Sequence, residues 1–208
     1  RFMAGLFEIP NQCQKLSILD PGAGSGILSI ALLERLQEVP SIRELQLVCY
    51  ENDPNVVDLL RTNLEMVCSQ SDKKISYKIL FDNYILSQAT DYNFMLGANL
   101  EPEKFDFVIG NPPYMKIAKD APEALAMPDV CYGAPNLYFL FASMSLFNLK
   151  ENGELVYIIP RSWTSGAYFK RFRQKFLSEG ILEHIHLFVS RDKVFEKESV
   201  LQETIIIK

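Results

Sequence analysis

The chain has 208 residues, of which 48% are hydrophobic and 23% are charged, and its formal net charge is −5. This composition is too apolar for a disordered chain, and four cysteines are too few for a disulfide scaffold. No apolar run approaches the roughly 20 residues that span a bilayer, and with no signal peptide the expected compartment is the cytoplasm. The acidic balance argues against a protein that coats nucleic acid nonspecifically.

Short apolar runs alternate with helical patterns along the whole chain. Strands are predicted at 16–19, 45–50, 75–81, 105–109, 155–159, 182–189 and 204–207, and helices at 26–38, 54–68, 137–149 and 166–179. The alternation predicts an α/β fold with a seven-stranded, mostly parallel sheet and helices on both faces. The last two strands have no helix between them and are expected to pair antiparallel. Residues 115–136 have no clear period and are predicted to form a long functional loop.

The first predicted strand runs into a glycine-rich turn, Asp20-Pro21-Gly22-Ala23-Gly24-Ser25-Gly26. Glycines at alternate positions let the backbone turn sharply and approach a ligand with no Cβ in the way. The spacing differs from the GxGxxG of dinucleotide folds, and no Lys-Ser or Lys-Thr pair follows it as in a P-loop. The turn therefore indicates a ligand loop, with a purely structural tight turn as the alternative.

Acidic residues follow the next two predicted strands. Glu51 precedes Asn52 and Asp53, and a carboxylate at this place can accept hydrogen bonds from both hydroxyls of a ribose. Asp82, followed by Asn83, can accept a hydrogen bond from an adenine amino group. The alternatives are that Glu51 or Asp53 caps the following helix and that Asp82 is a turn residue.

The fourth predicted strand ends in Asn111-Pro112-Pro113-Tyr114. Two consecutive prolines restrict the backbone and remove two N–H donors from the turn. The Asn111 side-chain oxygen and the Pro112 carbonyl can then face one point as a pair of acceptors, with Tyr114 as an aromatic face beside them. The turn suits a planar group that carries an NH₂; the alternative is a rigid turn with a buried tyrosine.

These four strand ends resemble those of the class I S-adenosylmethionine-dependent methyltransferases, and within them the N6-adenine DNA methyltransferases of restriction–modification systems. The order, glycine loop before the Asn-Pro-Pro-Tyr motif, is that of the gamma arrangement. Further similar segments follow in the family's order, so the similarity spans nearly the whole chain: 133–138, 158–163, 169–177 and 194–195. The chain departs from the family at Asn136, where Asp is usual, and at Asn52, where an apolar residue is common.

The resemblance implies a Rossmann-like fold, S-adenosyl-L-methionine as cofactor and no metal. It implies that Tyr114 and Phe195 stack on a flipped target base. Catalysis would fall to Asn111, Pro112, Pro113 and Tyr114, and cofactor binding to Asp20, Gly22, Ala23, Gly24, Glu51, Asn52, Asp82, Asn83 and Asn111. We expect residues 1–208 to be one catalytic domain cut from a longer protein, without the target-recognition domain.

Charge is unevenly distributed along the chain. Residues 1–160 carry a balance of −8 and residues 161–208 a balance of +3, with no acidic residue between positions 161 and 175. A solvated helix face would explain this stretch, but the resemblance implies that Arg161, Lys170, Arg171 and Arg173 contact the backbone of double-stranded DNA. The expected partners are therefore DNA and fused or separate target-recognition and nuclease domains.

The resemblance also implies a mechanism. Asn111 and Pro112 would accept both N–H bonds of the adenine amino group, localise its lone pair and aim it at the methyl group in a direct in-line displacement. Two alternatives stay open: the same chemistry on a protein glutamine or an RNA, and a non-catalytic module that binds DNA or a partner subunit.

Overall fold

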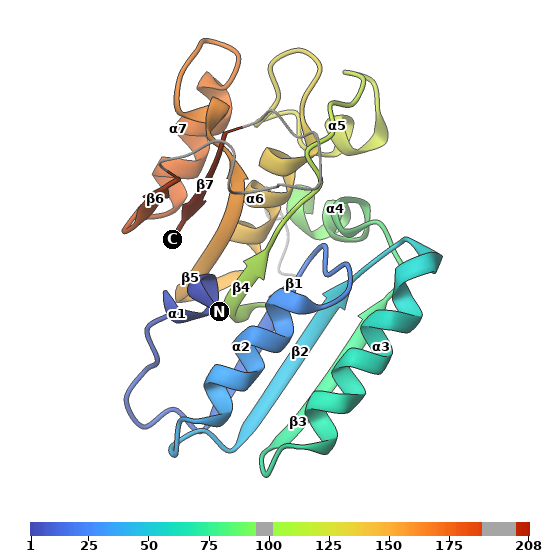
Figure 1. Ribbon diagram of the computed structural model, residues 1–208. Coiled ribbons are helices and arrows are strands. Elements are labelled where there is room, and N and C mark those ends of the chain that lie inside the picture. Colours follow the sequence, from blue (N-terminus) through green and yellow to red (C-terminus); the bar gives the residue numbers. More distant parts are fainter. Residues whose placement is uncertain (95–101, 189–202) are drawn as a thin grey trace.

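One seven-stranded sheet, with strand order β3-β2-β1-β4-β5-β7-β6, forms the centre of the computed structural model (Figure 1). The structure describes residues 1–94, 102–188 and 203–208. The strands are β1 (Lys15–Asp20), β2 (Glu44–Tyr50), β3 (Lys74–Leu80), β4 (Phe105–Gly110), β5 (Leu149–Pro160), β6 (Ile185–Leu187) and β7 (Thr204–Ile207).

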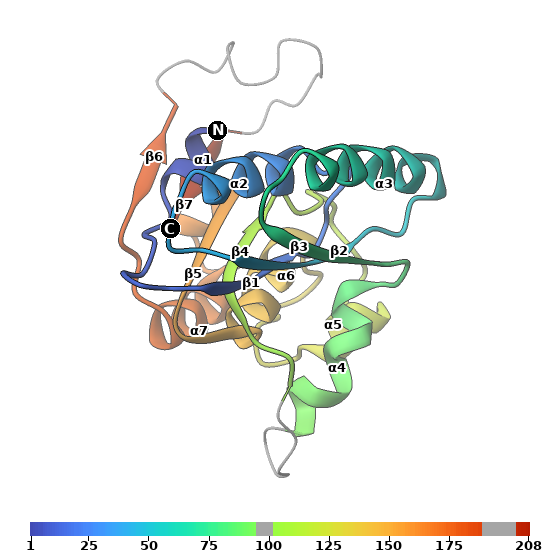
Figure 2. The same ribbon diagram turned by 90° about the horizontal axis from the view of Figure 1, so that it is seen from below.

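Helices cover both faces of this sheet, as the edge-on view of Figure 2 shows. One face carries α1 (Phe2–Gly5), α2 (Ile27–Gln37) and α3 (Pro54–Ser69). The other face carries α4 (Tyr84–Phe94), α5 (Pro122–Ala126), α6 (Leu137–Phe147) and α7 (Lys170–Glu179), and a 3₁₀ turn, η1 (Arg161–Thr164), follows β5. Among the helices in the described part of the chain, none has both the length and the apolar character needed to cross a bilayer.

The strand directions confirm the expected fold. β1 pairs in parallel with β2 and β4, β2 with β3, and β4 with β5. β7 runs antiparallel to both β5 and β6, so the last two strands form the expected antiparallel pair. Because the first four strands are parallel, their carboxyl ends, and the residues that follow them, meet at one edge of the sheet.

Two apolar cores lie on the two faces because side chains alternate along each strand. Ile18 and Phe107 pack with α2 and α3, and their neighbours Leu19 and Val108 pack with α6 and α7 on the other face. Central strands buried on both faces explain why the sequence shows continuous apolar runs there rather than alternation.

Some element boundaries differ from those predicted. Helix α4 was not predicted; Asn83 caps its first turn by accepting the Leu86 N–H at 3.2 Å. The predicted 166–179 helix begins only at Lys170, because Gly166 has a positive φ of 78° and breaks the helical path. β5 begins at Leu149 rather than 155 and passes an irregularity where it pairs with β4. The predicted loop 115–136 is closed at its base by an antiparallel bridge between Lys116 and Asn136, and it contains α5.

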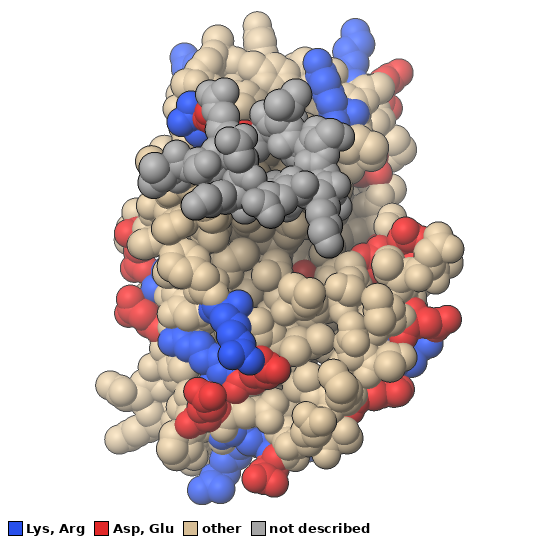
Figure 3. Space-filling model, viewed as in Figure 1, with Lys and Arg blue, Asp and Glu red and all other residues tan. Residues whose placement is uncertain are grey.

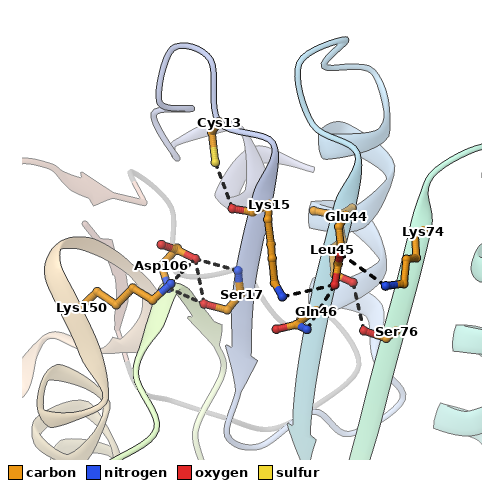
Figure 4. Close-up of polar contacts among 10 residues, drawn as sticks. All are labelled: Cys13, Lys15, Ser17, Glu44, Leu45, Gln46, Lys74, Ser76, Asp106 and Lys150. Atoms are coloured by element: carbon orange, nitrogen blue, oxygen red, sulfur yellow. Dashed lines mark hydrogen bonds and ion pairs between the residues drawn. The ribbon is translucent and has the colours of Figure 1, made fainter. Parts of the chain in front are cut away.

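Ionic and hydrogen-bonded contacts join the strands at the amino edge of the sheet (Figure 4). The Asp106 carboxylate accepts the Ser17 N–H at 2.7 Å, the Ser17 hydroxyl at 2.8 Å and the Lys150 ammonium at 2.8 Å. Partial burial acts to raise the pKa of Asp106, but the hydrogen bonds from Lys150 and Ser17 outweigh it and hold the pKa below its ordinary value. Asp106 therefore joins β1, β4 and β5.

Replacing Asp106 with alanine is expected to lower the free energy of unfolding by about 1–3 kcal/mol, because a backbone N–H and an ammonium lose their acceptor. The pKa of Asp106 is lower in the native state than in the unfolded state. The carboxylate's contribution to stability is therefore complete above the unfolded pKa of about 4 and is lost as the pH falls through the native pKa. Urea unfolding at pH 7 and pH 3 measures both effects. Asp58→Ala is the matched control, since Asp58 is exposed and, in the described part of the chain, its carboxylate pairs with Arg61 on its own helix; an equal effect in both variants would contradict the prediction.

A second ionic cluster surrounds Lys208. Its ammonium lies 3.2 Å from Glu8, 3.0 Å from Glu154 and 3.0 Å from Glu183. The three carboxylates are close enough together to resemble a cation site, but the lysine already supplies the positive charge. The cluster joins the segment after α1 to β5 and to the segment before β6.

Candidate active site

A cavity of about 380 Å³ lies at the carboxyl edge of the sheet, beyond the ends of β1, β2, β3 and β4. Residues from all four predicted strand ends line it: Gly22, Gly24, Glu51, Asn52, Asp82, Asn83, Asn111 and Pro113. A larger groove, of about 650 Å³, lies between the amino-terminal part of β5 and α7 and contains none of the predicted site residues. The chemistry-bearing residues therefore gather in the smaller cavity.

The glycine turn after β1 is held against the end of β2. Glu51 accepts the Gly24 N–H at 2.7 Å and the Asp53 N–H at 2.8 Å, and the Tyr50 carbonyl accepts the Ala23 N–H at 3.0 Å. Gly24 has a positive φ of 53°, which favours glycine. Asp53, rather than Glu51, caps α3, so the Glu51 carboxylate remains at the cavity.

Asp20, at the end of β1, is a buried carboxyl group. It is 1% exposed, its Oδ2 accepts the Ser29 hydroxyl at 2.7 Å, and its Oδ1 meets no hydrogen-bond partner in the described residues. Burial raises the pKa of Asp20 to about 7, because the Ser29 hydrogen bond offsets only part of the cost of burying the charge. The group therefore changes charge near neutral pH.

Because the native pKa of Asp20 lies above the unfolded one, its contribution to stability is complete below pH 4 and is lost as the pH rises through about 7. The Asp20→Asn variant keeps an acceptor for Ser29 but does not titrate. We expect its free energy of unfolding to exceed that of the wild type at pH 8. At pH 5 this difference should be smaller or absent. Urea unfolding at the two pH values measures this, and a stability difference that does not change with pH would contradict it.

Asp82 and Asn83 follow β3 and differ in their contacts. Asp82 is exposed at the cavity. Asn83 caps α4 and donates from Nδ2 to Glu123 Oε1 at 2.7 Å, which links the cavity to α5 in the 115–136 loop. The amide of Asn83 is thereby held in one orientation.

The turn after β4 depends on a close backbone approach. A Cβ added to Gly110 would lie 2.8 Å from Cε1 of the buried Tyr157, so only glycine fits there. Asn111 is exposed, Pro112 is buried and Pro113 lines the cavity. The Tyr114 hydroxyl donates to Asn111 Oδ1 at 2.6 Å. The turn thus presents the Asn111 amide at the cavity, while the half-buried Tyr114 ring packs against the apolar core.

Part of the cavity is lined by aromatic residues that the sequence analysis did not identify as site residues. Tyr50, Tyr84 and Phe141 lie in series, with ring centroids 5.1 and 5.4 Å apart. Phe141 belongs to α6, the helix predicted over 137–149, and Tyr50 is the last residue of β2. A Cβ added to Gly22 would lie 3.6 Å from the Phe141 ring, so the glycine turn and this ring lie close together on the cavity wall.

The basic stretch makes several contacts within the protein. Arg161 pairs with Glu203, Arg171 donates to the Cys131 carbonyl at 3.0 Å, and Lys170 is exposed. Arg173 donates to the carbonyls of Trp163, Ser165 and Gly166 and so holds the turn before α7. On the face seen in Figure 3, basic side chains are scattered among acidic ones. Phe195 lies outside the described residues. DNA contact by these residues stays a prediction.

Sequence comparisons with known proteins show the family of this chain. The family model described as Eco57I restriction-modification methylase matches residues 37–195. The chain is 34% identical over 210 residues to the type II methyltransferase M.BsuBI of Bacillus subtilis, and 35% identical over 207 residues to M.PstI of Providencia stuartii. These matches cover 100% and 98% of this chain but only 41% and 39% of the relatives, so the chain spans about two fifths of their length.

Solved structures share the fold. A protein from Listeria monocytogenes, classed among the class I S-adenosylmethionine-dependent methyltransferases, has a TM-score of 0.68 at 18% identity and covers 95% of this chain and 54% of its own. A methyltransferase from Agrobacterium tumefaciens has a TM-score of 0.53 at 10% identity, with coverage of 99% and 58%.

Proposed function

Because the chain belongs to the Eco57I restriction-modification methylase family, we propose that it is the catalytic domain of a DNA methyltransferase that methylates N6 of adenine. The observation that carries the proposal is the Asn111-Pro112-Pro113-Tyr114 turn at the mouth of a cavity that Glu51 and Asp82 also line. The protein would act on double-stranded DNA in the cytoplasm, within a restriction–modification system.

The cavity fits S-adenosyl-L-methionine, which supplies an activated methyl group when bound. Gly22 and Gly24 place no side chain between their backbone and the ligand. Glu51 has lone pairs beyond those that accept the Gly24 and Asp53 N–H groups. Glu51 and Asn52 would hold the ribose, Asp82 and Asn83 the adenine, and the turn from Asp20 to Gly24 the methionine end.

Residues of this chain would activate the target amine by accepting hydrogen bonds. Asn111 Oδ1 and the Pro112 carbonyl would take both N–H bonds of the adenine amino group, which aims the nitrogen lone pair along the line of transfer. The duplex base must first leave the stack, and an aromatic face is worth about 1–3 kcal/mol in holding it. We assign that face to Tyr114 and, in the part of the chain not described, to Phe195.

The basic residues that follow β5 would bind the DNA duplex. Arg161, Lys170, Arg171 and Arg173 lie around η1 and α7, which follow β5 on the same edge as the catalytic turn. Sequence recognition would come from a target-recognition domain, fused or separate, and restriction from a nuclease.

Single-molecule sequencing of DNA from cells that express the full-length protein tests the proposal. We expect N6-methyladenine in one sequence context, absent when Asn111 is replaced with alanine. Unmethylated DNA together with methylated glutamine or RNA would favour transfer to another amide or amine. Failure of the intact protein to bind S-adenosyl-L-methionine in calorimetry would favour a non-catalytic DNA-binding or partner-binding module.

A further inference from the structure

The hydroxyl group of Tyr114 has two acceptors within reach and one hydrogen to give. Its oxygen lies 2.6 Å from Asn111 Oδ1 and 2.9 Å from the carbonyl oxygen of Ile158 on β5. Because a phenol carries a single O–H, it can donate fully to only one of them at a time. The hydroxyl therefore stands between the side chain that follows β4 and the backbone of the neighbouring strand.

The ring that carries this hydroxyl is held in place. Tyr114 is half-buried, and its ring meets Tyr138 edge-on, with centroids 6.4 Å apart. Tyr138 is itself buried, and its hydroxyl lies 3.1 Å from Ser162 Oγ. Burial raises the pKa of Tyr114 well above its ordinary value, so the hydroxyl keeps its proton at every working pH and acts as a donor rather than a base.

The side-chain amide of Asn111 accepts a hydrogen bond from this donor. The side chain is exposed, and its amide has two nearly isosteric orientations, of which only one presents an oxygen to an amine. A separation of 2.6 Å between the oxygens is typical of an O–H···O hydrogen bond. With the phenol hydrogen directed at it, the oxygen of Asn111 is the atom held in place.

We propose that the Tyr114 hydroxyl is a two-position donor that orients Asn111 before the target amine arrives and then releases it. In the free enzyme the hydroxyl donates to Asn111 Oδ1. When the amine of the flipped base donates to that oxygen, the hydroxyl turns its hydrogen to the Ile158 carbonyl. Asn111 Oδ1 and the Ile158 carbonyl then each accept one hydrogen bond. This positioning role, which rests on the proposed function, is separate from the stacking role of the ring.

The Tyr114→Phe variant separates the two roles because it keeps the ring and removes only the hydroxyl. The test uses the full-length protein and two duplexes that carry its recognition site: one has adenine at the target position and gives kcat, and the other has 2-aminopurine there and reports base flipping. We expect kcat to fall about tenfold, while the 2-aminopurine signal and the dissociation constant of S-adenosyl-L-methionine stay within about twofold. The matched control is Tyr92→Phe, which removes a hydroxyl bound to Asp129 and should leave kcat unchanged.

An unchanged or increased kcat in Tyr114→Phe would overturn the inference, as would a fall in kcat that is matched by loss of the 2-aminopurine signal. A second readout needs no DNA: the NMR order parameter of the Asn111 side-chain amide should drop in Tyr114→Phe but not in Tyr92→Phe. If the wild type methylates no DNA, the proposed function fails, and the order parameter alone decides whether the hydroxyl orients Asn111.

Discussion

Replacing Asn111 with alanine is expected to reduce kcat for methyl transfer by about a hundredfold or more, because the target amine loses an acceptor that is in place before the reaction. The dissociation constant of S-adenosyl-L-methionine should change by no more than about fivefold, the equivalent of one hydrogen bond. Single-turnover transfer of labelled methyl groups measures the first quantity, and calorimetry the second.

The control for this variant is Asn93→Ala, an asparagine on α4 that hydrogen-bonds to the carbonyls of Ala89 and Ala126. It should retain wild-type turnover. Undiminished turnover of Asn111→Ala would remove Asn111 from the mechanism. Equal losses of turnover and cofactor affinity would give it a binding role only.

Replacing Gly110 with alanine is expected to lower kcat by about a hundredfold, because the new methyl group would lie 2.8 Å from the Tyr157 ring and must displace the catalytic turn. Tyr157 cannot move away easily, since it is fully buried and its hydroxyl lies 2.6 Å from Ser145 Oγ. The same strain should lower the free energy of unfolding by about 1–3 kcal/mol.

Gly5→Ala is the matched control for this substitution. Gly5 ends α1, has no neighbouring atom within 4 Å of an added Cβ and has no positive φ. The control should keep full activity and stability, since alanine favours a helix. Turnover of Gly110→Ala close to that of the wild type would show that the turn tolerates a shift of this size.

Much of the site followed from sequence because parallel strands carry their following residues to a common edge. Gly22, Glu51, Asp82 and Asn111 are separated by about thirty residues each, yet all line one cavity. Helix α4 could have been found from Asn83 as a cap and from the apolar spacing of Tyr84, Ile85 and Tyr92. Apolar periodicity did not distinguish Phe141 as a cavity residue, because a ring that lines a cavity and a ring in the core have the same pattern.

The sequence by itself determined the α/β class, the parallel order of the first strands and the set of residues that meet at their carboxyl ends. These follow from local patterns and from a general property of parallel sheets. Only the tertiary structure decided which partners the polar groups have. Arg173 binds the turn before α7, and the Tyr114 hydroxyl lies between Asn111 and β5, because both contacts depend on how side chains from separate elements pack. The buried state that raises the pKa of Asp20 likewise exists only once α2 has packed on the sheet.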